Sequence, residues 1–190
     1  MRMLFIDWNK KRSYGFRKYI RRQLVDGVEE IHFVNPKRGY VEGLCFRNFP
    51  QLHIKQNQML QCAFENCGEI FLTTDCGHAW CRFENIKVLH CACSFLTKSQ
   101  FENIQCDSTA LIELEKCRMS DCQFRNIHLL NETLLVYGQG ASYITRSDLC
   151  NVVTERKDGK FFFRNERSLW PFVDEDTKVN VSEVNCDEHL

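Results

Sequence analysis

The chain has 190 residues, of which 44% are hydrophobic and 26% charged, so it can build a packed core and is not intrinsically disordered. Its formal net charge is zero, which argues against a nucleic-acid mimic, because such a protein is acidic throughout. The charge is uneven, with eight basic and one acidic residue in 1–25 and six acidic and one basic residue in 171–190. No run approaches the roughly 20 apolar residues that span a bilayer, and no signal-peptide pattern opens the chain. We therefore expect a cytoplasmic protein.

Residues 1–28 are expected to form an N-terminal cap. Residues 3–8 alternate weakly, as a strand does. Residues 11–25 are expected to form an amphipathic helix, because apolar residues recur every three or four positions with basic residues between them. Such a helix covers the open end of a repeat structure, and its cationic face also suits a phosphate group, a membrane surface or an acidic partner. The predicted partner-binding residues are Arg17, Lys18, Arg21 and Arg22.

Residues 29–153 are expected to form a solenoid, beginning with a strand over 31–35, because a Phe-x-Asn pattern recurs. The phenylalanines of the pattern are 18, 19, 18 and 23 residues apart, and they are Phe46, Phe64, Phe83, Phe101 and Phe124. A repeat of this period indicates stacked coils that present the same residue types to their neighbours. We expect each phenylalanine to point inward and stack on the next. Each asparagine should occupy a corner, where it tolerates a left-handed backbone and can bond the next asparagine.

Phe-x-Asn followed by Cys or Ile resembles the right-handed parallel β-helix of the pectate-lyase-like superfamily. Consecutive five-residue units are also present, as in 117–121, 122–126 and 127–131. These units are similar to those of pentapeptide-repeat proteins, whose coil has four sides. Both resemblances imply right-handed coils of parallel strands, and they leave open whether a coil has three sides or four. The first implies carbohydrate binding or cleavage, and the second implies a DNA-mimicking binder of a topoisomerase.

Residues 154–190 are expected to form a C-terminal cap. Asp158-Gly159 separates two strand-like runs, which is typical of a β-hairpin. The acidic tail contains an alternating segment over 179–184 that can add an edge strand. The complete prediction is an all-β solenoid, a right-handed parallel β-helix with an N-terminal capping α-helix and a C-terminal hairpin cap.

Twelve cysteines suggest disulfides, metal ligands or a buried ladder. We favour reduced thiols in the core, because three cysteine pairs are five residues apart and no export signal is present. The nearest approach to a metal motif is Cys76-Gly-His78 with His90-Cys91-Ala-Cys93. A Cys-x-Cys pair in a strand points both thiols to one side, here expected to be the core, so we predict no metal site and no cofactor.

No catalytic motif is present. The scattered charged candidates for a polysaccharide-cleaving site are Asp75, Lys98, Asp107, Arg118 and Asp121. They share no pattern, whereas a catalytic site needs groups that converge, so we expect no enzymatic activity. The sequence favours a macromolecular-interaction module, an adaptor or inhibitor, whose partner is a protein with an acidic surface. We expect neither nucleic acid nor a small molecule as its ligand.

Overall fold

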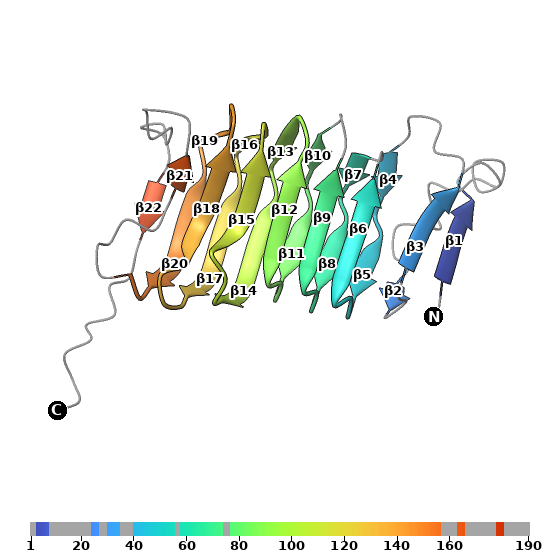
Figure 1. The fold of residues 1–190 in the computed structure, drawn as a ribbon, viewed down its shortest axis with the longest axis horizontal. Helices are drawn as coiled ribbons and strands as arrows, with labels where there is room; N and C mark the ends of the chain where they lie inside the picture. Colours follow the sequence, from blue (N-terminus) through green and yellow to red (C-terminus); the bar gives the residue numbers. More distant parts are fainter. Residues whose placement is uncertain are drawn as a thin grey trace.

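The computed structural model describes residues 3–7, 24–26, 30–34, 40–55, 58–73, 77–156, 163–165 and 178–180. They form a parallel β-solenoid in which the chain passes repeatedly through three sheets, so that strands far apart in sequence lie side by side (Figure 1). Every described strand pair is parallel, as expected for stacked coils.

Sheet I has eight strands: β2 (Leu24–Asp26), β5 (Cys45–Arg47), β8 (Ala63–Glu65), β11 (Arg82–Glu84), β14 (Gln100–Cys106), β17 (Gln123–Leu129), β20 (Asp148–Thr154) and β22 (Lys178–Asn180). Sheet II has six: β4 (Tyr40–Glu42), β7 (Gln58–Leu60), β10 (His78–Ala79), β13 (Phe95–Thr97), β16 (Arg118–Ser120) and β19 (Tyr143–Thr145). Sheet III also has six: β6 (Gln51–Lys55), β9 (Glu69–Thr73), β12 (Val88–Ala92), β15 (Ala110–Glu115), β18 (Leu134–Gln139) and β21 (Phe163–Asn165). A separate pair joins β1 (Met3–Asp7) to β3 (Glu30–Val34).

The predicted phenylalanine column is confirmed. Phe46, Phe64, Phe83, Phe101 and Phe124 occupy the same register position in successive strands of sheet I. All five are fully buried, and neighbouring rings stack with centroids 4.8 to 5.1 Å apart. Because parallel strands align identical positions, one residue type repeated at the coil period produces a continuous column through the core.

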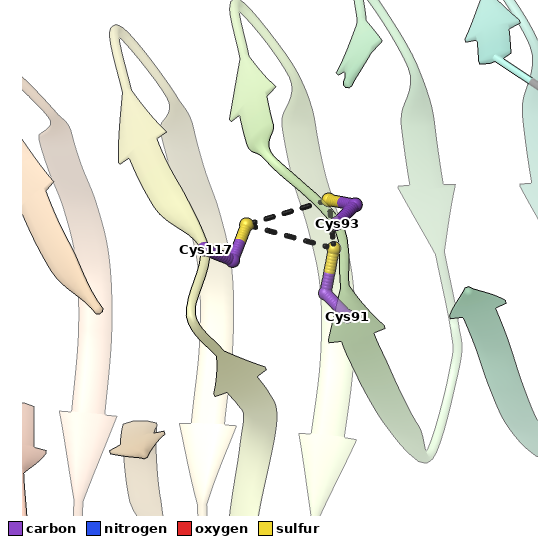
Figure 2. Close-up of side chains that lie close together, drawn as sticks. All are labelled: Cys91, Cys93 and Cys117. Atoms are coloured by element: carbon purple, nitrogen blue, oxygen red, sulfur yellow. Dashed lines mark hydrogen bonds between the residues drawn. The ribbon is translucent and has the colours of Figure 1, made fainter. Parts of the chain in front are cut away.

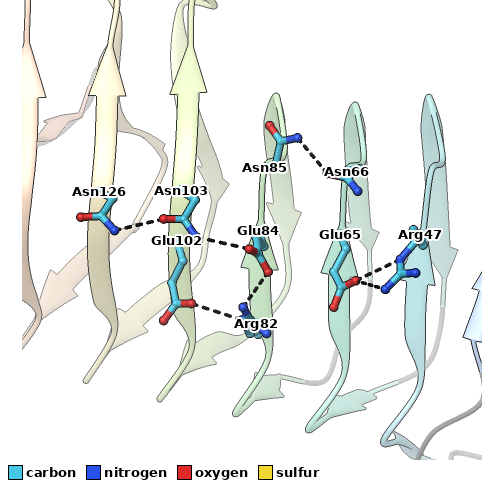
Figure 3. Close-up of polar contacts among 9 residues, drawn as sticks. All are labelled: Arg47, Glu65, Asn66, Arg82, Glu84, Asn85, Glu102, Asn103 and Asn126. Atoms are coloured by element: carbon cyan, nitrogen blue, oxygen red, sulfur yellow. Dashed lines mark hydrogen bonds and ion pairs between the residues drawn. The ribbon is translucent and has the colours of Figure 1, made fainter.

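The predicted asparagine corners are confirmed as well. The asparagine that follows each strand, or bends it, has a positive φ between 50° and 60°; these residues are Asn48, Asn66, Asn85, Asn103, Asn126 and Asn151. Asparagine tolerates this left-handed conformation better than most residues. The side chains also bond along the stack: Asn85 donates to Asn66 at 2.8 Å, and Asn126 donates to Asn103 at 3.0 Å (Figure 3).

The coils widen toward the C-terminus. Strands β8 and β11 stop at the asparagine corner, whereas β14, β17 and β20 have seven residues and continue beyond it. The additional residues pair with one another, as in Ile104 with Ile127 and Ile127 with Val152. This extra length accounts for the change from coils of 18 and 19 residues to a coil of 23 residues.

The expected caps are corrected in part. Leu24 and Val25, the end of the predicted helix, lie in strand β2, and residues 11–23 lie outside the described residues. The predicted hairpin is wrong, because β20 and β21 lie in different sheets and each pairs in parallel with an earlier coil. Residues 179 and 180 of the predicted edge segment lie in strand β22, beside β20, and residues 181–184 lie outside the described residues. Within the described residues, no helix is long and apolar enough to cross a membrane.

Replacing Phe83 with Ala is expected to lower the free energy of unfolding by about 3–5 kcal/mol, because it leaves a cavity between two stacked rings. Urea denaturation measures the change. Gln100→Ala, on the exposed side of the neighbouring strand, is the control and should change stability by about 0.5 kcal/mol or less. A loss below about 1 kcal/mol for Phe83→Ala would contradict the register of the column.

Candidate functional site

The four basic residues predicted to bind a partner lie outside the described residues. They are Arg17, Lys18, Arg21 and Arg22. Within the described residues, the candidate sites lie on the outer faces of the three sheets and among the polar groups of the core.

The outer face of sheet II carries rows of side chains in register along the stack, and it is hollowed beside Phe95, Arg118 and Tyr143. Its floor is a row of small residues in register: Ala79, Thr97, Ser120 and Thr145. One wall is the outward row Phe95, Arg118 and Tyr143. The other wall is made of the corner residues that follow the strands, Trp80, Lys98, Asp121 and Arg146, all with positive φ. We call this surface the sheet II trough.

Two large apolar side chains stay exposed at the trough, Trp80 at 52% and Phe95 at 37%. The ring of Phe95 lies against Gly77, where any Cβ would come within 2.2 Å of it. Cations pack on the other aromatic rings: Lys98 Nζ lies 5.4 Å from the Trp80 ring, and the Arg118 guanidinium lies 4.7 Å from the Tyr143 ring. These contacts hold the aromatic groups in place at the surface.

The trough is predominantly basic. Lys116 and Arg118 line its hollow, and the corner residues Lys98 and Arg146 add two cations against the carboxylate of Asp121. Arg146 binds Asp121 through both oxygens, at 2.9 and 3.0 Å, and this hydrogen bonding lowers the pKa of Asp121. A hollow of about 420 Å³ lies beside Phe95, Arg118 and Tyr143.

Ion pairs link neighbouring strands on the outer face of sheet I. Arg47 pairs with Glu65, with atoms 2.6 Å apart. Arg82 joins Glu84 at 2.6 Å and Glu102 at 3.2 Å (Figure 3). Each of these three carboxylates therefore faces an arginine and is neutralised within the sheet.

The outer face of sheet III carries a second ring column. The rings of His53, Phe71 and His90 stack with centroids 4.4 and 4.3 Å apart. His90 Nδ1 then lies 2.9 Å from a carboxylate oxygen of Glu113 in the next strand. This column is not evident in the sequence, because histidine and phenylalanine alternate at its positions and no single residue type recurs there.

A groove of about 780 Å³ lies where the coils widen. The narrow coils contribute corner asparagines, with Glu69 and Lys87, and the wider coils contribute Gln105, Asp107 and Leu130. The groove exists because the additional residues of β14 and β17 project beyond the narrower coils. We call it the step groove.

The core contains a thiol cluster at the corner between sheets III and II (Figure 2). Cys91 lies in β12, Cys93 directly follows that strand, and Cys117 directly precedes β16 in the next coil. Their sulfurs are 3.1 Å (Cys91–Cys93), 3.4 Å (Cys93–Cys117) and 4.0 Å (Cys91–Cys117) apart. In the part of the chain that the structure describes, this is the group of three His, Cys, Asp or Glu side chains whose ligand atoms converge within 4.8 Å.

The thiols of this cluster share hydrogen bonds. Those with Cys91 and Cys93 lower the pKa of Cys117, and the bond to Cys117 raises the pKa of its two neighbours. Elsewhere burial dominates, raising the pKa of Cys62 to about 11 and that of Cys122 to about 12. The cluster therefore differs from the other described core thiols, because hydrogen bonds between sulfurs act there beside burial.

His78 is a buried titratable group in the inward row of sheet II. It is fully buried, and its Nδ1 accepts a hydrogen bond from the Met59 amide at 3.1 Å. Among the residues that the structure describes, its Nε2 finds no hydrogen-bond partner. Burial lowers the pKa of His78 to about 4, so the imidazole is neutral near neutral pH.

The charged candidates for catalysis do not form one constellation. Lys98, Arg118 and Asp121 lie on the sheet II trough, where they contact Trp80, Tyr143 and Arg146 respectively. Asp107 lies in the step groove, and Asp75 lies outside the described residues. Sequence reasoning missed Trp80 and Phe95, although Trp80 could have been noticed because a large apolar residue occupies a corner position.

No protein-family model matches the chain, and no curated protein or solved structure is significantly similar to it. The residues of the trough, the groove and the core are therefore interpreted from their own geometry and chemistry.

Thiol titration of the native protein is expected to leave eight of the ten described cysteines unreactive, because they are buried and only Cys45 and Cys150 are accessible. Denaturation in urea should expose all twelve. Rapid reaction at most positions of the native protein, or several disulfides found by mass spectrometry, would contradict a core of reduced thiols.

Acid is expected to destabilise the protein through His78. The unfolded histidine takes up a proton near pH 6.5, whereas the folded one does so near pH 4. The unfolded state therefore binds more protons between these values, and stability falls as the pH drops from about 6.5 to 4. His78→Leu is the matched variant, because Leu96 occupies the same position in the next coil. Between pH 7 and 4.5 the wild type should lose roughly 2–3 kcal/mol more than the variant; equal losses in urea denaturation would disprove the effect.

Proposed function

We propose that the protein is a non-enzymatic interaction module, an adaptor or inhibitor, whose sheet II trough docks an acidic segment of a partner protein. The observation that carries the proposal is the exposure of Trp80 and Phe95 beside the basic residues that line the trough. Exposed tryptophan, tyrosine and arginine are the residue types that dominate binding energy at protein interfaces.

The shape of the trough supports an extended partner segment. Its small-residue floor crosses successive coils, and Thr97 and Ser120 offer hydroxyl groups there, 3.0 Å apart. The cations of the walls favour carboxylates, and such attraction accelerates association and weakens as salt screens it. The basic residues Arg17, Lys18, Arg21 and Arg22, predicted from the sequence to bind a partner, have the same charge preference. The buried thiols support the cytoplasm as the compartment, since thiols stay reduced there.

A second candidate is carbohydrate binding, which the pectate-lyase-like resemblance would favour. Its specific support is the step groove, where corner amides, Glu69 and Asp107 face a common space. Hydrogen-bonding groups in a groove of this size suit the hydroxyl groups of a sugar chain. The pentapeptide-repeat alternative, a DNA mimic, has less support, because the row of glutamates on sheet I is neutralised by Arg47 and Arg82.

The test compares Arg118→Glu with Arg125→Glu, since both arginines are exposed and belong to neighbouring strands of one coil, but only Arg118 faces the trough. Binding is first measured with three probes: a glutamate-rich peptide, a lysine-rich peptide and a neutral polysaccharide. The partner is then captured from the native cell by cross-linking and pull-down. Arg118→Glu and Trp80→Ala should each weaken binding of the acidic peptide and the partner by roughly tenfold or more, whereas Arg125→Glu should not.

Salt dependence provides the control for the electrostatic component, since wild-type binding should weaken as ionic strength rises. Equal binding by wild type and both trough variants, with folding intact by circular dichroism, would rule out the trough. Binding of the polysaccharide alone, lost in Asp107→Asn, would favour the step groove instead.

A further inference from the structure

The thiol cluster differs from the other buried cysteines in its contacts. The regular core thiols reach backbone carbonyls of adjacent coils, as Cys62 does at 3.4 Å from Val41 and Cys81 does at 3.6 Å from Met59. Cys91, by contrast, makes its hydrogen bonds, among the described residues, with the sulfurs of Cys93 and Cys117. Packing alone does not require three sulfurs to converge.

The convergence results from a local departure from the repeat. Cys117 precedes the inward residue of β16 by two positions, and Ser142 occupies the equivalent place in the next coil. In the preceding coil the register equivalent is Ser94, which is exposed, while Cys93 turns inward in its place. Cys91 and Cys93 therefore point to the same side as Cys117, one coil below it.

We propose that Cys91, Cys93 and Cys117 form a binding site for one thiophilic metal ion, Cu(I) or Zn(II). Three sulfurs bound to one ion at about 2.3 Å lie about 3.8–4.0 Å apart. The observed separations are 3.1, 3.4 and 4.0 Å, so binding must move Cys91 and Cys93 apart by about 0.7–0.9 Å and Cys93 and Cys117 apart by about 0.4–0.6 Å, while the third edge already fits. Soft thiolate ligands select these two ions over harder cations.

Binding replaces the three S–H protons with the ion, and the protons pass to solvent. Lys116 and Arg118 directly precede and follow Cys117 in the chain, and both are exposed. Cys93 is 5% exposed and directly precedes two exposed residues, Ser94 and Phe95, so the ion enters at this corner.

The chain offers a closely matched pair of variants. Cys117→Ser removes one ligand, and Ser142 shows that the next coil holds serine at this position. Cys122→Ser is the control outside the cluster, because serines occupy its register position in both adjacent coils, Ser99 and Ser147. Both changes replace a buried thiol with a hydroxyl group that the repeat already accommodates.

The experiment uses the full chain purified anaerobically with reductant and loaded separately with Zn(II) and with Cu(I). Competition with a chromophoric chelator and elemental analysis then give affinity and stoichiometry. Wild type and Cys122→Ser should hold one ion per chain, and Cys117→Ser should bind at least about 100-fold more weakly. X-ray absorption should count three sulfur neighbours, and the better-held ion identifies the occupant. Melting temperature should rise on loading in the first two proteins and not in Cys117→Ser.

Three results would overturn the site: no ion retained by the wild type in either arm, equal retention by Cys117→Ser, or a disulfide among the three cysteines that persists in the presence of reductant. Should Cys117→Ser fail to fold, Cys93→Ser takes its place, since Cys93 lies at the corner and contacts solvent. The outcome is independent of the trough, because neither serine variant alters a side chain of that surface.

Discussion

Parallel strands in successive coils pair residue for residue, so each inward position must suit the position above it and the one below. The phenylalanine column satisfies this constraint for sheet I, where rings 4.8 to 5.1 Å apart continue from Phe46 to Phe124. The asparagine corners hold the column in register, because their left-handed backbone turns the chain at the same point of each coil. Where the column ends, Leu149 takes the next position and keeps the core apolar.

Outward side chains are not subject to this packing constraint, and the three outer faces carry different kinds of side chain. Sheet I neutralises its charges with Arg47 and Arg82, sheet III stacks two imidazoles on a phenyl ring, and sheet II leaves Trp80 and Phe95 at the surface. In the part of the chain that the structure describes, sheet II places two exposed aromatic side chains, Trp80 and Phe95, beside the cations Lys98 and Arg118. The stacking of the coils does not require these outward side chains to be aromatic, because they lie outside the core.

Departures from the repeat give the molecule its specific sites. Widening of the coils beyond Asn103 produces the step groove, because the later coils project past the earlier ones. The irregular corner before β13 turns Cys93 inward where the repeat places Ser94, and this substitution brings three sulfurs together. His78 likewise interrupts a row otherwise formed by Met59, Leu96 and Met119, which makes it a buried base in an apolar core.

The sequence by itself determined the solenoid, the inward phenylalanines, the asparagine corners and the burial of most cysteines, because these follow from residue types that recur at the coil period. It did not determine the partners of outward residues or the meeting of Cys91 with Cys117, which lie 26 residues apart. Those depend on how coils of unequal length align, a property of the stack and not of any one coil. The hairpin expected at Asp158-Gly159 also depended on the stack. Strands β20 and β21 form backbone hydrogen bonds with strands of the preceding coil, and not with each other.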